Sequence, residues 1–140
     1  MSKNWRDNMR TGIEIVDDDH QQLFALIQEF HANADANGGQ VSVEKLGKIL
    51  DSLQDYARDH FEREEYLQQE ARYDGYEDNK RQHDELRRTL AVFVTKFKDG
   101  SLGEPRTATT KMRDFLDVWL SGHIVKTDRR MRGRILPWAG

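Results

Sequence analysis

The 140-residue sequence contains no cysteine, and this absence excludes several kinds of functional site. Disulfides, thiolate zinc sites, iron–sulfur clusters and cysteine nucleophiles all require a thiol. Histidine, aspartate and glutamate are the metal ligands that remain. Any metal ion would therefore be bound through nitrogen and oxygen atoms.

Proline, a surplus of basic residues and long apolar runs are also scarce or missing. The two prolines, Pro105 and Pro137, leave the preceding stretch up to residue 104 free to form helices. The formal net charge of -3 gives no general attraction to nucleic acid or to an anionic membrane surface. The sequence has no signal-peptide core and no run of about 18 apolar residues. We expect a soluble, cytoplasmic protein with no nucleic-acid or membrane partner.

The composition is typical of amphipathic helices, with 34% charged and 36% apolar residues. Turn sequences rich in glycine divide the chain into four apolar-periodic stretches, which predict helices over about residues 18–36, 42–70, 77–98 and 107–135. Asp17 or Asp18 is the expected N-cap of the first helix. Helices of this length with short connections predict an all-α fold, an antiparallel up-down-up-down four-helix bundle.

The predicted domain organisation is simple. Residues 1–16 are expected to form an N-terminal arm that packs on the bundle. Residues 17–136 would form the bundle itself, and residues 137–140 a short C-terminal tail. One domain of this size is expected to carry one site.

Polar residues interrupt the apolar stripe of each predicted helix. Four of the five histidines lie on these inward stripes: His20, His60, His83 and His123. Glu64 follows His60 by one helical turn and Asn79 precedes His83 by one turn, so each pair shares a helix face. Asp128 follows His123 by five residues, about 140° around an ideal helix, so helix periodicity alone does not place it on the same face.

Buried imidazoles and carboxylates need a hydrogen-bond network or a metal ion to offset the cost of burial. Nitrogen and carboxylate ligands without thiolate inside a helix bundle favour iron, with manganese or zinc as alternatives. Glu64 and Asp128 are the candidates for bridging two metal ions, because two neighbouring dications need anionic groups between them.

Several segments together resemble the hemerythrin family, in particular single-domain bacteriohemerythrins. The resemblance runs from about Trp5 to Leu136. Its motifs are Thr11-Gly12-Ile13, residues 15–23 (IVDDDHQQL), residues 60–65 (HFEREE), His83 and residues 119–128 (WLSGHIVKTD).

The resemblance implies two iron ions joined by an oxo or hydroxo bridge, with Glu64 and Asp128 as bridging carboxylates. The implied ligands are His20, His60, Glu64, His83, His123 and Asp128. In the family the bridging aspartate also follows its histidine by five residues. The apolar pocket for dioxygen would be lined by Trp119, Leu120 and Ile124.

The sequence departs from the family at one ligand. Hemerythrins normally carry His-x-x-x-His on the third helix, and Asn79 occupies the first position here. The resemblance assigns the missing ligand to the iron with three histidines. A second open coordination position is therefore expected unless the Asn79 amide oxygen or a water molecule fills it. Asn79 could be a ligand, a water anchor or an inert replacement. Met131, where the family often has tyrosine, is a second departure.

The implied function is dioxygen binding for storage, delivery or sensing. The alternative is a di-iron enzyme that reacts with dioxygen, peroxide or nitric oxide at the extra open position, together with an unidentified redox partner. His31 lies about 16 Å along the helix from His20, so we expect it to pack at the rim of the bundle and not to bind metal.

Overall fold

The computed structural model describes residues 9–35 and 42–133, apart from the side chains of Lys126 and Arg129. Five α-helices and one short 3-10 helix follow one another in these ranges: α1 (Glu14–Asp35), α2 (Val43–Glu70), α3 (Tyr76–Asp99), α4 (Pro105–Trp119), α5 (Ser121–Lys126) and η3 (Asp128–Met131). No strand occurs in the described part of the chain.

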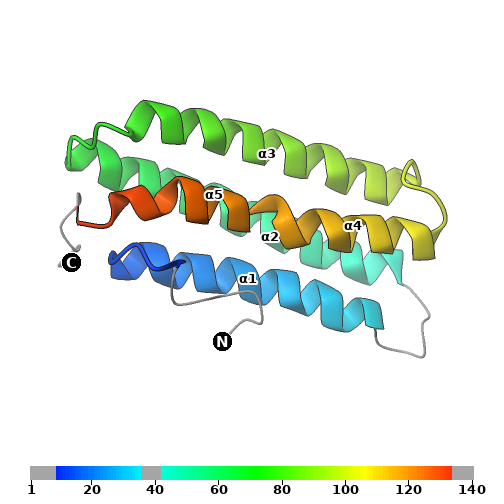
Figure 1. The fold of residues 1–140 in the computed structure, drawn as a ribbon. Helices are drawn as coiled ribbons and strands as arrows, with labels where there is room; N and C mark the ends of the chain where they lie inside the picture. The colour runs from blue at the N-terminus through cyan, green and yellow to red at the C-terminus, as the bar shows by residue number, and fades with distance from the viewer. Residues whose placement is uncertain (1–8, 36–41, 134–140) are drawn as a thin grey trace.

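The helices form an antiparallel bundle in which α4 and α5 run end to end as the fourth rod (Figure 1). α2 packs against both α1 and α3, and α4 contacts α1 and α3 to close the bundle. The predicted antiparallel four-helix bundle is confirmed. Each rod therefore turns one stripe toward a shared interior.

The start of α1 differs from the sequence prediction. The helix begins at Glu14, so Asp17 lies in its first turn and neither Asp17 nor Asp18 is the N-cap. The Asp17 carboxylate instead accepts hydrogen bonds from the backbone N–H groups of Thr11 (2.8 Å) and Gly12 (3.2 Å). Gly12 has a φ of +85°, which favours glycine. This tight loop brings the fully buried Ile13 to the start of the helix.

The prediction of one continuous fourth helix over residues 107–135 is also wrong in detail, because the helix is interrupted. Leu120 separates α4 from α5, and α5 ends at Lys126. Thr127 has φ −118° and ψ −57°, outside regular α-helix geometry, and η3 begins at the next residue. These local changes of backbone direction decide where the side chain of Asp128 lies.

Two apolar clusters fill the interior, and a polar layer lies between them. On α1, Val16 belongs to the smaller cluster and Leu23 to the larger one, with His20 between them. On α2, Leu67 and Phe61 belong to the smaller and larger clusters, with Glu64 between them. The polar residues of the predicted stripes therefore meet at one level of the bundle.

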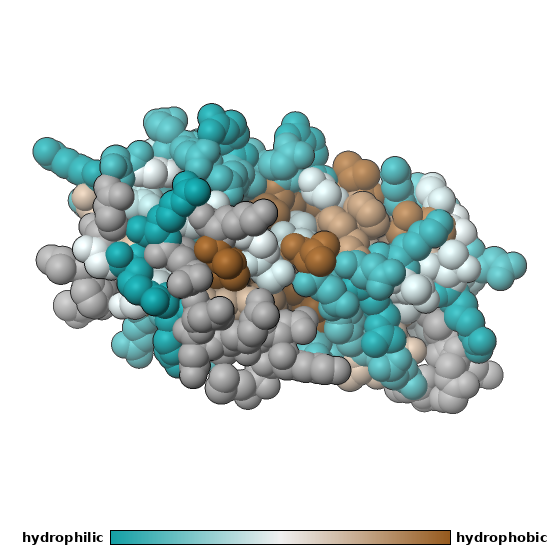
Figure 2. Space-filling view, in the orientation of Figure 1, coloured by the Kyte–Doolittle hydropathy of each residue, from teal (hydrophilic) through white to brown (hydrophobic). Residues whose placement is uncertain are grey.

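One face of the bundle can be described by its hydropathy. On the face shown in Figure 2, hydrophilic side chains cover much of the described surface and hydrophobic side chains gather toward its middle. Among the described helices, none combines the length and apolar character needed to cross a membrane.

Candidate metal centre

Six buried side chains converge in the polar layer from four directions. His20 comes from α1, His60 and Glu64 from α2, His83 from α3, His123 from α5 and Asp128 from η3. They form two groups whose potential ligand atoms all lie within 4.8 Å of one another: His20, His60, Glu64 and Asp128, and Glu64, His83, His123 and Asp128. The two carboxylates belong to both groups.

One oxygen of each carboxylate faces the first histidine pair, His20 and His60. Nε2 of His60 lies 3.0 Å from Oε2 of Glu64. Nε2 of His20 lies 3.2 Å from Oδ2 of Asp128 and 3.6 Å from Oε2 of Glu64. These four side chains enclose the first candidate metal position.

The other oxygen of each carboxylate faces the second pair, His83 and His123. Nε2 of His83 lies 3.5 Å from Oε1 of Glu64, and Nε2 of His123 lies 2.9 Å from Oδ1 of Asp128. Each carboxylate thus divides its two oxygens between two histidine pairs. This is the arrangement that two bridging carboxylates require.

Asn79 lies on the side of the second pair and is fully buried. Its Nδ2 donates hydrogen bonds to Oε1 of Glu64 and Oδ1 of Asp128, both at 3.2 Å. Its Oδ1 has no hydrogen-bond partner in the part of the chain that the structure describes. The amide therefore touches both carboxylates through its donor end.

The chemistry of the donor set fits metal ions. Within residues 9–35 and 42–133, no hydrogen-bond partner is found for the buried Nε2 atoms of the four histidines, for Oε2 of Glu64 or for Oδ2 of Asp128. Such unsatisfied buried atoms are rare and costly in proteins. Cations bound between them would satisfy the nitrogen lone pairs and the carboxylate charge together.

Three outer residues hold the histidines in place, and the sequence analysis did not identify any of them. Asp19 accepts a hydrogen bond from Nδ1 of His60 (3.0 Å), and Glu65 from Nδ1 of His83 (2.8 Å). Gln82 Oε1 accepts from Nδ1 of His123 (2.8 Å). With Nδ1 protonated in each ring, Nε2 presents its lone pair to the centre.

These outer residues follow a regular pattern along the chain. Asp19 precedes His20, Glu65 follows Glu64, and Gln82 precedes His83. Each one supports a histidine on the next rod of the bundle. A polar residue next to a candidate ligand in the sequence could therefore have indicated these outer residues. The sequence does not show which histidine each of them would hydrogen-bond.

The Asp19 carboxylate is the most heavily bonded of these outer groups. It also accepts from Tyr56 Oη (2.7 Å) and from Arg63 Nε (2.9 Å) and Nη2 (3.1 Å). Burial opposes its ionisation, but the hydrogen bonds from His60, Arg63 and Tyr56 outweigh burial and hold its pKa well below the usual range. Asp19 is therefore an anion that orients His60.

The inner groups are strongly perturbed by one another. Burial alone would lower the pKa of His20, but the Asp128 and Glu64 carboxylates beside it raise this pKa to about 10. Burial also opposes protonation of His83, and Glu64 and Glu65 raise its pKa to about 9. The neighbouring histidines hold the pKa of Glu64 well below its usual value, although burial acts in the opposite direction. Without metal, protons would occupy part of the space between the carboxylates.

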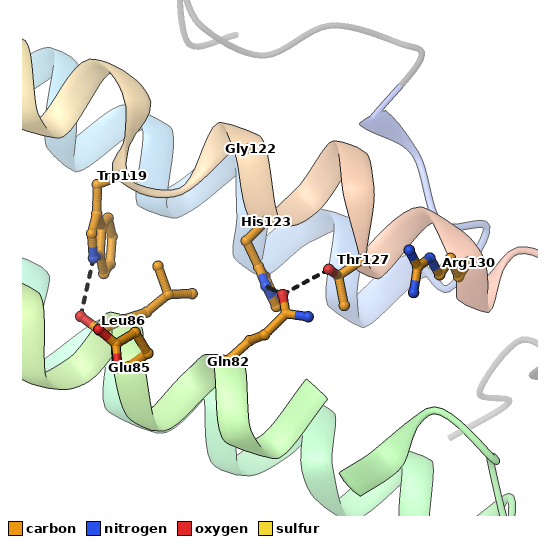
Figure 3. A pocket seen from close by; sticks show the side chains of 8 residues that line it. All are labelled: Gln82, Glu85, Leu86, Trp119, Gly122, His123, Thr127 and Arg130. Atoms are coloured by element: carbon orange, nitrogen blue, oxygen red, sulfur yellow. Dashed lines mark hydrogen bonds between the residues drawn. The ribbon is translucent and has the colours of Figure 1, made fainter. Parts of the chain in front are cut away.

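One edge of the centre borders a cavity of about 410 Å³ between α3 and α5 (Figure 3). His123 forms part of its wall and is 8% exposed, whereas the other five candidate ligands are 0% exposed. Gln82 points across the cavity to His123 and Thr127, and Trp119 lies at one end. Small solutes can therefore approach the centre from the side of His123.

Trp119, Leu120 and Ile124, the residues expected around dioxygen, are all buried. They belong to the larger apolar cluster, and Trp119 Nε1 donates to the backbone oxygen of Leu86 (3.1 Å). His31 lies away from the centre and its Nε2 is 2.7 Å from Oδ1 of Asp117. It joins α1 to α4, as a packing residue at the rim would.

Met131 is connected to the candidate metal centre by the side chain of Gln68. Gln68 is fully buried, and its Nε2 donates to Sδ of Met131 (3.2 Å) and more weakly to Oε1 of Glu64 (3.5 Å). Met131 therefore contributes to the carboxylate environment through the Gln68 amide.

Comparisons with known proteins show similarity to the hemerythrin family. The family model described as "Hemerythrin HHE cation binding domain" matches residues 11–135. The chain is 33% identical over 119 residues to the bacteriohemerythrin of Methylococcus capsulatus, covering 85% of each protein. It is 26% identical over 131 residues to the myohemerythrin of Sipunculus nudus, covering 94% of this chain and 92% of that protein.

A solved structure, the crystal structure of wild-type hemerythrin, superposes with a TM-score of 0.74 and 31% sequence identity. The match covers 92% of this chain and 94% of that one. The range that the family model matches, residues 11–135, spans the positions of the two histidine pairs and both carboxylates. The chain therefore belongs to the hemerythrin family.

Proposed function

We propose that this protein holds two iron ions in the polar layer and binds dioxygen there, for storage, delivery or sensing. His20 and His60 would bind one ion, and His83 and His123 the other. Glu64 and Asp128 would bridge the two ions beside an oxo or hydroxo group. The observation that carries this proposal is the division of each carboxylate's oxygens between the two histidine pairs.

Two ferrous ions together can supply the two electrons that reversible binding of dioxygen requires. The protein contributes the surroundings. Asp19, Glu65 and Gln82 orient three of the histidines through Nδ1. Buried Leu120 and Ile124 keep the neighbourhood apolar, which restricts water and protons near the bound molecule.

Metal analysis and optical spectroscopy test this proposal. After anaerobic reconstitution with ferrous iron we expect two irons per chain. Reduced protein exposed to air should develop an absorption band that persists and then disappears when oxygen is removed. One iron or none per chain would contradict the two-iron site.

A second candidate function is enzymatic, and two observations favour it. Asn79 places amide donors, and not a ring nitrogen, beside the second histidine pair. The cavity that borders His123 opens on this same side. An ion there would have one nitrogen ligand fewer and access to small solutes. The alternative function is therefore a reaction with dioxygen, peroxide or nitric oxide at the two metal ions. In the optical experiment, an enzyme of this kind would show a short-lived absorption band and rapid conversion to a stable oxidised state.

A further inference from the structure

The two candidate metal positions differ in how their carboxylate oxygens are satisfied. On the side of His83 and His123, both oxygens already accept hydrogen bonds from neutral amides. Asn79 Nδ2 donates to Oε1 of Glu64 and to Oδ1 of Asp128, and Gln68 Nε2 approaches Oε1 of Glu64 at 3.5 Å. These donors partly compensate the negative charge on that side.

On the side of His20 and His60, no amide donor reaches the carboxylate oxygens among the described residues. Oε2 of Glu64 and Oδ2 of Asp128 are buried and have no hydrogen-bond partner among the described residues. Only ring nitrogens approach them, at 3.0 to 3.6 Å. A cation at this position would replace protons on ring nitrogens and would displace no amide donor, whereas the second position holds the Asn79 amide.

We infer that the two positions fill in order, with the His20 and His60 position occupied first and the His83 and His123 position second and more weakly. This inference rests on the proposed two-metal site. A cation at the second position must break the two hydrogen bonds from Asn79. It can recover a ligand only if the amide turns over, which would present the unpartnered Oδ1.

One feature of the second position acts in the opposite direction. Both of its histidines are oriented by outer residues, Glu65 and Gln82, whereas Nδ1 of His20 has no hydrogen-bond partner among the described residues. Orientation favours binding at the second position, but it does not remove the need to displace Asn79. Because two hydrogen bonds to charged acceptors are lost, we expect the first ion to bind at least about tenfold more tightly.

Native mass spectrometry with Co²⁺ as the probe measures this order directly, because it counts chains with no, one and two ions. At limiting Co²⁺ the wild-type protein should accumulate the one-ion species. His123→Gln and His83→Gln should retain the first ion with nearly wild-type affinity. His20→Gln and His60→Gln should lose it. Using two variants on each side, with helicity checked by circular dichroism, guards against a variant that does not fold.

Asn79→His tests the cause of the inequality. It replaces the amide donors with a ring nitrogen, so the one-ion species should decrease and the two ions should bind with similar affinity. His31→Ala, remote from the centre, should behave like wild type.

Direct conversion of the metal-free protein to the two-ion form would overturn the order while leaving the two-metal site intact. Equal loss of the first ion on both sides would also overturn it. Binding of a single ion at saturating Co²⁺, even in Asn79→His, would overturn the two-metal proposal itself.

Discussion

His123 and Asp128 are five residues apart in sequence, yet Nε2 of His123 lies 2.9 Å from Oδ1 of Asp128. A continuous α-helix would separate these side chains by about 140° around its axis. The end of α5 at Lys126 and the change to η3 at Asp128 bring them together. The position of Asp128, the second candidate bridging carboxylate, therefore depends on the end of a helix.

The bridging role proposed for Glu64 predicts a specific loss of metal. Glu64→Ala removes oxygens that face both histidine pairs, so iron content after reconstitution should fall sharply below that of wild type. His31→Ala should retain full iron content, because His31 pairs with Asp117 outside the centre. Inductively coupled plasma analysis of both variants provides the measurement. Equal iron loss in the two variants would rule out this ranking.

The outer carboxylate Asp19 should affect metal affinity without binding metal. Asp19→Asn retains the shape of the side chain but weakens the hold on His60 and Arg63, so metal affinity should fall about 10- to 100-fold. Asp18→Asn is the matched control, because Asp18 is adjacent but exposed. Competition with a chelator measures both affinities. Similar affinities in the two variants would show that Asp19 does not orient a ligand.

Metal uptake should strengthen as pH rises. The raised pKa values of His20, about 10, and His83, about 9, exceed the ordinary value of 6.5. Protonation of these two histidines therefore adds to the free energy of unfolding of the metal-free protein, and this contribution is complete below about pH 6.5. The contribution is lost as the pH rises through about 9 and 10, where the histidines of the folded protein lose their protons. Because metal ions bind neutral imidazole, uptake near pH 7 must release protons.

Calorimetry of Zn²⁺ binding in buffers with different ionisation enthalpies measures the protons released. We expect release near neutral pH and weaker release above about pH 10. Affinity and proton release that do not change with pH would contradict protonated histidines in the metal-free centre.

Asn79→His should make the oxygenated form last longer. The substitution restores a ring nitrogen on the side of His83 and His123 and removes the amide donors from Glu64 and Asp128. Azide and peroxide should then perturb the optical spectrum less than in wild type. Stopped-flow absorbance gives both measurements, and identical lifetimes and peroxide reactivity would show that Asn79 is functionally silent.

Substitutions at two glycines test how backbone conformation affects the free energy of unfolding, independently of metal binding. Gly122 lies in α5 and an added Cβ would meet nothing within 4 Å, so Gly122→Ala should raise the free energy of unfolding by about 0.5–1 kcal/mol. Gly100 caps α3 with a φ of +84° and is equally uncrowded, so Gly100→Ala should lower it by about 1 kcal/mol. Urea unfolding of the metal-free proteins gives both values. A shift of the same sign in both variants would contradict this explanation.

Much of the architecture can be predicted from the sequence because helix periodicity is a local property. Apolar residues at three- and four-residue steps indicate the rods, and glycine-rich turns indicate their ends. The same steps place His20, His60, Glu64 and His83 on inward faces. The helix start was less predictable, since the contacts of Asp17 with Thr11 and Gly12 let α1 begin at Glu14.

Tertiary structure alone decided how the inward side chains meet. Periodicity cannot show that Glu64 turns Oε2 to one histidine pair and Oε1 to the other, because the positions of three other rods determine those distances. It also cannot assign Asp19 to His60, since these residues lie on different helices.

Asn79 shows most clearly which features follow from the sequence and which depend on the tertiary structure. Its identity and inward position can be read from the sequence, and so can its departure from the family motif. Only the packed bundle decides that its amide donors contact two carboxylates from α2 and η3. A sequence pattern specifies which face of a helix is buried, whereas contacts between helices depend on how all the rods pack together.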